Sequence, residues 1–183
     1  MLFFLMKPIA IFSCLIAATT LTQAAPTYFS TTGHYYDFVT GFQTWSSANS
    51  GATASTYLGA VGHLVTISDA SENAFLATTF QDTGWMGLVK DPLVSAPQSG
   101  WAWVTGEPFA YANWNSGEPN NNTVQGPENR GEFYSSGTWN DLNENPIGNG
   151  INGYFVEYEP VPEPTSLALC VLGSAALLIR RRR

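Results

Sequence analysis

Alternating apolar and polar positions predict a strand near each end of the central part of this chain. Residues 35–39 read Tyr-Tyr-Asp-Phe-Val, and residues 153–158 read Gly-Tyr-Phe-Val-Glu-Tyr. Both segments are rich in the aromatic and β-branched residues that strands favour. We expect them to pair as the first and last strands of one domain, which would bring its two ends together.

Two helices are expected between these strands. The segment Thr44-Trp45-Ser46-Ser47-Ala48 predicts the start of a first helix. Asp69, followed three residues later by Glu72, has the spacing of a capping box and predicts the start of a second helix. That helix should bury Ala74, Phe75 and Phe80 or their neighbours. Strands with two separate helices predict an α+β fold.

The region from Asp91 to Asn149 is rich in Gly, Pro, Asn and Trp and precedes the last strand. We expect it to be largely irregular. So long a loop is uncommon in a compact domain unless it is functional or held in place by a metal. Four tryptophans, by contrast, have strand-like neighbours, and we expect them in the core rather than at a sugar surface: Trp85, Trp101, Trp103 and Trp139.

The N-terminal segment has the pattern of a secretory signal peptide. Lys7 is followed by an apolar run from Ile9 to Leu21 and by the small-residue site Thr22-Gln23-Ala24. We expect cleavage after Ala24, with the true start at Met1 or Met6 left open. An uncleaved anchor is the rival interpretation, although the run is shorter than the roughly 20 residues that a membrane span needs.

The C-terminal segment combines a short motif, an apolar run and a basic cluster. Val161-Pro162-Glu163-Pro164 is followed by mostly apolar residues from Thr165 to Ile179 and by the arginines 180–183. This order resembles a PEP-CTERM sorting signal, which implies handling by an exosortase in bacteria that make exopolysaccharide. Arginines on the inner side of the membrane fit the positive-inside rule. A plain membrane anchor is the alternative, and whether the tail is cleaved or retained stays open.

The charge between these segments is strongly acidic. Only Lys90 and Arg130 are basic there, whereas all fourteen acidic residues lie between Asp37 and Glu163. Nucleic acid and anionic membrane are therefore improbable partners, because binding either needs a positive patch. Some acids should merely solvate the surface, and we expect this of Glu107, Glu144, Glu157 and Glu159.

Cysteine and histidine offer little chemistry. Cys14 and Cys170 both lie in the terminal apolar segments, so the domain between them has no internal disulfide. About 135 residues are enough for an ordinary core to supply the stability. His34 and His63 lie in strand-like segments without a second ligand at metal spacing, and we expect both to be structural.

Oxygen ligands gather inside the long region. Three carboxylates and two carboxamides stand there in order: Glu118, Asn120, Glu128, Asn140 and Asp141. A hard cation such as calcium takes six to eight oxygens of this kind. A carboxylate or an amide can bind the metal and still accept from or donate to a sugar hydroxyl, so the set would bind a sugar without converting it. The isomer of the bond before Pro119 is not readable from sequence.

These residues belong to a longer pattern that resembles a C-type lectin-like domain from His34 to Tyr158. Residues 85–88, Trp-Met-Gly-Leu, are similar to the core motif of that family. Glu118-Pro119-Asn120 is similar to its sugar-binding loop, and Trp139-Asn140-Asp141 to its last calcium cluster. Glu128 stands eleven residues before Trp139, the spacing of the remaining acidic ligand.

The resemblance implies an α+β fold with two helices, small antiparallel sheets and a long calcium-binding loop region. One calcium ion would be held by Glu118, Asn120, Glu128, Asn140 and Asp141, of which the first four would also contact the sugar. The Glu-Pro-Asn order implies mannose, glucose, N-acetylglucosamine or fucose. The segment from Asn121 to Pro127 is about two residues longer than in animal lectins, and the usual cysteines are missing. A second calcium site using Asp91, Asn121 and Asn129 stays open.

We therefore expect a signal peptide at 1–24, a lectin-like domain at 25–160 and a sorting tail at 161–183. The favoured function is calcium-dependent carbohydrate binding at the bacterial surface or in an exopolysaccharide biofilm matrix, with no enzymatic activity. The alternative is adhesion or matrix structure through protein contacts, with calcium only structural. A glycan hydrolase using Glu118 and Glu128 is a third hypothesis, but metal ligation would leave it without a proton donor.

Overall fold

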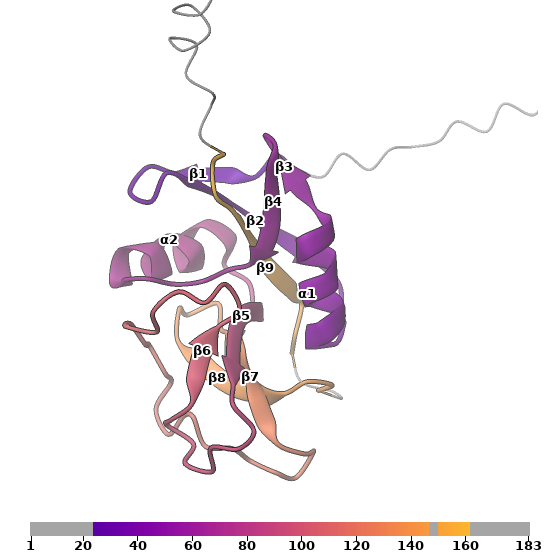
Figure 1. Ribbon diagram of the computed structural model, residues 1–183, viewed down its shortest axis with the longest axis vertical. Coiled ribbons are helices and arrows are strands. Elements are labelled where there is room, and N and C mark those ends of the chain that lie inside the picture. Colours follow the sequence, from indigo (N-terminus) through magenta and orange to yellow (C-terminus); the bar gives the residue numbers. More distant parts are fainter. Residues whose placement is uncertain (1–23, 147–149, 162–183) are drawn as a thin grey trace, which may run out of the picture.

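The computed structural model describes residues 24–146 and 150–161. The predicted signal peptide, both cysteines and the sorting tail lie outside these residues, apart from Ala24 and Val161 at their edges. The elements follow in chain order (Figure 1): β1 (Thr27–Phe29), β2 (His34–Thr40), α1 (Trp45–Ala54), β3 (Thr56–Tyr57), β4 (Ala60–Leu64), α2 (Ala70–Phe80), β5 (Gly84–Lys90), β6 (Trp101–Trp103), β7 (Glu128–Phe133), β8 (Trp139–Asn143) and β9 (Gly153–Tyr158).

The strands connect into one sheet around β9. Its main path runs β1-β2-β9-β5-β7-β8, with β4 pairing β9 and β3, and β6 pairing β5. Every pair is antiparallel except β5 with β9. The pairing of β2 with β9 confirms the predicted contact between the two alternating segments. Figure 1 shows α1 and α2 on either side of β2 and β9, with β5 to β8 forming the other half of the molecule.

Both helices begin where the sequence predicts. The Thr44 hydroxyl accepts the Ser47 N–H (3.1 Å), and the Asp69 carboxylate accepts the N–H groups of Ser71 (2.8 Å) and Glu72 (3.0 Å). The Glu72 carboxylate accepts the backbone N–H of Ser68 (2.7 Å), so its return contact lies one residue before the cap. Each cap satisfies backbone donors that the first helical turn leaves free.

The buried face of α2 differs in part from the residues that the prediction names. Leu76, Glu72 and Asn73 are its buried residues, and Phe75 and Phe80 pack against the core while partly exposed. Ala74 itself is exposed, and its neighbour Asn73 is buried in its place, within the alternative that the prediction left open. The helix turns a partly polar face inward because Glu72 and Asn73 have hydrogen-bond partners in the interior.

The tryptophans form the core as predicted. Trp85 and Trp139 are fully buried, and Trp101 and Trp103 are nearly so. The Trp139 ring packs edge-on against Trp103, with centroids 5.8 Å apart, and against Trp114 at the same distance. Aromatic side chains bury a large area each, which allows a domain without an internal disulfide to form a core.

A buried polar network joins β2, α2 and β9. Glu157 is 2% exposed, so the expectation that it solvates the surface is wrong. Its carboxylate contacts His34 Nδ1 (2.6 Å) and accepts the Thr66 N–H (3.0 Å). The Tyr36 hydroxyl donates to Glu72 (2.6 Å). The alternating pattern was misleading because β9 lies inside the sheet and is buried on both faces.

The region from Asp91 to Asn149 is less irregular than expected. It contains β6, β7 and β8, which all join the main sheet. The short length of β6 and the polar composition of β7 concealed them in the sequence. Within the described ranges, neither helix is long and apolar enough to cross a membrane.

Candidate functional site

Two loop segments that are distant in sequence are joined at Trp139. The N–H of Asn115 donates to the Trp139 carbonyl (2.8 Å), and the Trp139 N–H donates to the Asn113 carbonyl (2.9 Å). The Trp139 ring nitrogen donates to the Asn73 side chain of α2 (2.8 Å). A buried indole with a hydrogen-bond partner is firmly oriented. We call the loop that carries Glu118 and Asn120 the ligand loop. Its start is therefore held against Trp139, the first residue of β8.

Asp141 holds the next part of that loop through the backbone. Its two carboxylate oxygens accept the N–H groups of Asn120 (2.9 Å) and Asn121 (2.8 Å), and the side chain is fully buried. The peptide bond between Glu118 and Pro119 is cis, which answers the question that the sequence left open. These contacts place Glu118 and Asn120 beside Asn140.

Glu128 holds the segment from Asn121 to Pro127 by hydrogen bonds at both its side chain and its backbone. Its carboxylate accepts the Asn122 N–H (2.6 Å), while its own N–H donates to the side-chain oxygen of Asn121 (3.0 Å). The longer segment between Asn121 and Pro127 forms a compact loop with Glu128 at its base. The extra length therefore does not move Glu128 away from the other candidate ligands.

An open cleft of about 510 Å³ lies between this loop, β7 and β8. Four of the five predicted ligands line it, namely Glu118, Asn120, Glu128 and Asn140. Asp141 does not line the cleft but lies beneath it and supports the loop. The remaining lining residues were not predicted: Thr83, Asn122, Glu132, Tyr134, Leu142 and Gly150.

The carboxylates of the cleft repel one another. Burial, followed by the charge of Asp141, raises the pKa of Glu118. Burial is also the main reason why the pKa of Glu128 rises to about 7, with repulsion from Asp141, Glu118 and Glu132 adding to it. The Oε2 atom of Glu118 is buried and has no hydrogen-bond partner among the described residues. A buried acceptor without a donor is costly, and a cation would relieve both the repulsion and the missing bond.

Sequence reasoning missed Glu132. It is 3% exposed and accepts a hydrogen bond from the side-chain nitrogen of Asn140 (2.9 Å). Burial raises its pKa to about 7. With its nitrogen engaged, Asn140 keeps its amide oxygen for another partner in the cleft. One sign of this role was present in the sequence. Glu132 lies in the same short segment as Glu128, and that segment forms β7.

The cleft has enough oxygen ligands for a hard cation only when the side-chain amides also coordinate it. No group of three or more His, Cys, Asp or Glu side chains within residues 24–146 and 150–161 is placed to hold a metal alone. The cleft adds the amides of Asn120 and Asn140 to the carboxylates of Glu118 and Glu128, and all their donor atoms are oxygens. This all-oxygen set and the unpartnered Glu118 oxygen fit calcium. Asp91 and Asn121 accept backbone N–H groups in turns, and a second site remains a prediction.

Comparisons with known proteins agree with this geometry. The family model described as the lectin C-type domain matches residues 53–146, and the model of the PEP-CTERM protein-sorting motif matches residues 160–183. The carbohydrate-recognition domain of cow CD23, solved in the presence of an oligosaccharide, has a TM-score of 0.61 and 27% identity. The match covers 76% of this chain and 97% of that domain.

Two curated relatives are similar over most of this chain. Mouse C-type lectin domain family 4 member G is 33% identical over 137 residues, which are 74% of this chain and 42% of that protein. Halomucin from Haloquadratum walsbyi is 30% identical over 141 residues, which are 69% of this chain and 1% of halomucin. This chain thus spans less than half of either relative. The chain belongs to the C-type lectin domain family, which binds carbohydrates and usually calcium, and it carries a PEP-CTERM sorting motif.

Proposed function

We propose that the domain is a calcium-dependent carbohydrate-binding module for mannose-type sugars. The observation that carries this proposal is the cleft in which Glu118, Asn120, Glu128 and Asn140 present oxygen atoms together, one of them buried and unpartnered. The resemblance to the cow CD23 carbohydrate-recognition domain, solved with an oligosaccharide that contains mannose and N-acetylglucosamine, supports the choice of ligand.

The proposed metal ligands are Glu118, Asn120, Glu128 and Asn140, which line the cleft, and Asp141, whose oxygens also hold the loop backbone. Calcium bound there would offer its remaining coordination positions to two vicinal hydroxyls of a sugar. The carboxylates of Glu118 and Glu128 would accept hydrogen bonds from those hydroxyls, and the amide nitrogen of Asn120 would donate one. The Asn140 amide has two N–H donors, and Glu132 engages one of them, so the other would donate to the sugar.

Binding without turnover follows from the same chemistry. A hydrolase acting through two carboxylates needs one of them protonated as an acid. Glu118 and Glu128 would both stay ionised as metal ligands, so neither would be available as that acid. Members of this fold family are typically not catalytic.

The sorting motif indicates where the protein is located. That motif supports export and sorting to the surface through an exosortase. We propose the boundaries 1–24 for the signal peptide, 25–160 for the lectin domain and 161–183 for the tail. The ligand would then be an exopolysaccharide or another glycan at the cell surface. Weak binding by single sites would be strengthened by many copies on one surface.

The test is retention on mannose-agarose in calcium buffer followed by elution with EDTA. We expect the protein to be retained and then released by the chelator. Asn140→Ala should abolish retention, whereas Asn145→Ala, at an exposed asparagine outside the cleft, should not. Retention that persists in EDTA, or that survives Asn140→Ala, would contradict the proposal.

A second candidate is a domain in which calcium only stabilises the loop. The specific observation in its favour is that Asp141 and Glu128 hold the loop backbone by direct hydrogen bonds. In this alternative the supported loop would contact a protein partner instead of a sugar. This alternative predicts that Asn120→Ala lowers thermal stability in calcium while sugar binding is absent from the unaltered protein as well.

A further inference from the structure

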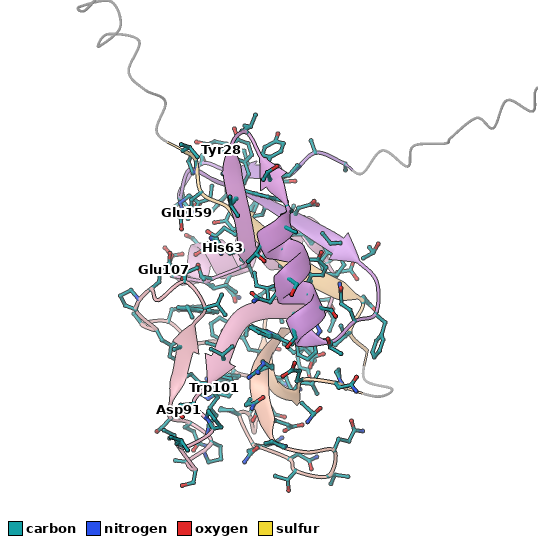
Figure 2. All side chains as sticks on the ribbon, turned by 45° about the vertical axis from the view of Figure 1, so that its right-hand side comes forward. Tyr28, His63, Asp91, Trp101, Glu107 and Glu159 are labelled. Atoms are coloured by element: carbon teal, nitrogen blue, oxygen red, sulfur yellow. The ribbon has the colours of Figure 1, made fainter. Side chains whose placement is uncertain are left out.

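Exposed apolar side chains gather at the end of the molecule where the described chain begins and ends. Tyr28 in β1 is 52% exposed, and Leu58 and Val61 in the β3–β4 hairpin are 68% and 61% exposed. Val161, which follows β9, is 55% exposed. Figure 2 shows Tyr28 at one end of the molecule and Asp91 and Trp101 at the other. Exposed apolar side chains that lie together often mark an interaction site.

Tyr28, Leu58 and Val161 are connected through the rings of Tyr35 and Tyr57. The rings of Tyr28 and Tyr35 lie 5.0 Å apart between centroids, as do those of Tyr35 and Tyr57. Tyr57 and Leu58 line a pocket of about 160 Å³ together with Val161. We call this surface the tyrosine end and define it by its members: Tyr28, Tyr35, Tyr57, Leu58 and Val161.

Leu58 is placed against two local preferences. Its φ is 47°, a left-handed conformation that asparagine and glycine adopt far more readily than leucine. Its side chain is also largely in solvent. Asn-Gly is the favoured pair for such a hairpin turn, whereas this chain has Leu58-Gly59. Leucine is thus unfavourable here both for its positive φ and for its exposed side chain. Contact of the side chain with lipid would account for it.

The tyrosine end is also close in sequence to the apolar run of the tail. Only three residues, 162–164, separate Val161 from the apolar run of Thr165 to Ile179. From Val161 to Thr165 the chain takes four residue steps, so even fully extended it spans at most about 14 Å. If the apolar run enters a bilayer, Val161 therefore lies within about that distance of the lipid, and the tyrosine end is the nearest apolar surface. Ala24 to Pro26 line a neighbouring pocket with Tyr57, so the apolar N-terminal segment also leaves from this end.

The composition of the hairpin suits a lipid surface without needing positive charge. Residues 55–62 contain no charged side chain, and tyrosine is favoured at the boundary between lipid tails and water. Asp37 and Glu159 are the acidic residues beside the tyrosine end. The calcium cleft lies in the other half of the molecule, with β7 and β8 (Figure 1).

We propose that the tyrosine end docks on the bilayer that holds the tail, so that the calcium cleft faces away from the membrane. The inference rests on the expectation from the sequence that the apolar run from Thr165 to Ile179 enters a bilayer, and it applies while the tail is attached. It does not depend on sugar binding, so its test and that of the lectin function can fail separately.

The experiment places an environment-sensitive NBD dye on the full chain in phosphatidylcholine vesicles. Leu58→Cys carries the dye in one protein and Leu93→Cys in the control, each with Cys14→Ser and Cys170→Ser. Leu93 is 91% exposed and precedes β6 in the other half of the molecule. We expect a blue-shifted emission at position 58, with loss of intensity when the lipids carry a nitroxide quencher, and neither change at position 93.

Further proteins separate docking from its alternatives. A dye on Cys170, with Cys14→Ser alone, reports whether the tail is in the bilayer. Leu58→Asn should weaken hydrogen-exchange protection of residues 56–61 on vesicles without lowering the melting temperature, because asparagine suits the turn better. Equal dye behaviour at 58 and 93, or a water-exposed Cys170 dye, would overturn the proposal. So would a blue shift at 58 that disappears when the vesicles hold one chain each, because it would indicate contact between copies.

Discussion

The carboxylate of Asp141 accepts the backbone N–H of Asn120 at 2.9 Å, so a residue of β8 determines where the ligand loop lies. Its second oxygen accepts the N–H of Asn121. Asp141 thereby acts on the cleft from below, without lining it. The loop is supported before any metal binds, which lowers the entropy that binding must overcome.

Replacing Asp141 by asparagine should loosen this loop. The amide can accept only one of the two N–H groups, and a buried donor left without an acceptor costs about 1–3 kcal/mol. We expect Asp141→Asn to lower the free energy of unfolding by about that amount, measured with urea in EDTA. Asp91→Asn is the matched control because Asp91 also accepts a backbone N–H but is exposed. Equal urea midpoints for the two variants would refute this role of Asp141.

Glu132→Gln should have opposite effects on the metal-free and the metal-bound protein. The change removes a buried charge beside Glu118 and Glu128 but keeps an oxygen that can accept from Asn140. In EDTA near neutral pH we expect a gain of about 1 kcal/mol in stability, because a buried ionised carboxylate is costly. Calcium affinity should fall because the cleft is less negative.

Thermal melts of Glu132→Gln with and without calcium would measure both effects. Glu107→Gln, outside the cleft, provides the control and should change neither. A loss of stability in EDTA would show that the Glu132 charge supports the fold.

Tyr36→Phe should destabilise the domain at a distance from the cleft. The Tyr36 hydroxyl is fully buried and donates to Glu72 at 2.6 Å. Losing a hydrogen bond to a buried charged group costs about 1.5–3 kcal/mol. Urea unfolding would measure this loss, and Tyr28→Phe at an exposed tyrosine should leave the midpoint unchanged. A similar midpoint for both variants would mean that the network contributes nothing to stability.

Stability should fall as pH rises through the pKa of His34. The hydrogen bond to Glu157 raises that pKa above 6.5, so the stabilisation is complete below about pH 6.5 and is lost as the pH passes the raised value. Glu157, Glu159, Glu72 and Tyr36 are the titratable groups around His34. The pKa of Glu72 is also raised, mainly by burial, and contributes in the same direction.

The measurement is the melting temperature between about pH 6 and about pH 9, with calcium present throughout. We expect a smaller decrease in His34→Gln than in the unaltered protein. His63→Gln is the control, because His63 lies on β4, which is separated from β2 by β9, and its acidic neighbour at 3.7 Å is the exposed Glu159. The same slope in the His34 variant would assign the pH dependence to other groups.

The residues of the cleft were predictable because their types and order carry chemistry. Glu118, Asn120, Glu128 and Asn140 are oxygen donors at specific spacings, and the folded chain does bring them to one cleft. Glu132 was not predictable in the same way. A single glutamate in a polar segment gives no sign that its strand will be covered on that side.

The differences between the expected and the observed fold have a common cause. Local alternation identifies a strand but not how many of its faces are covered, and Glu157 is buried because both faces of β9 are covered. Ala74 is exposed because polar Glu72 and Asn73 occupy the buried face of α2. In both cases the partner of a buried polar group lies far away in sequence, where no local pattern can reveal it.

Calorimetry of a sugar titrated into the protein tests the central claim most directly. Calcium is first titrated into the metal-free protein, and methyl α-mannoside is then titrated with and without calcium. The account predicts calcium binding that is lost in Asn140→Ala, and sugar binding, at about millimolar affinity, only when calcium is present. Calcium binding without any sugar binding would contradict the lectin function, and no calcium binding at all would contradict the proposed site.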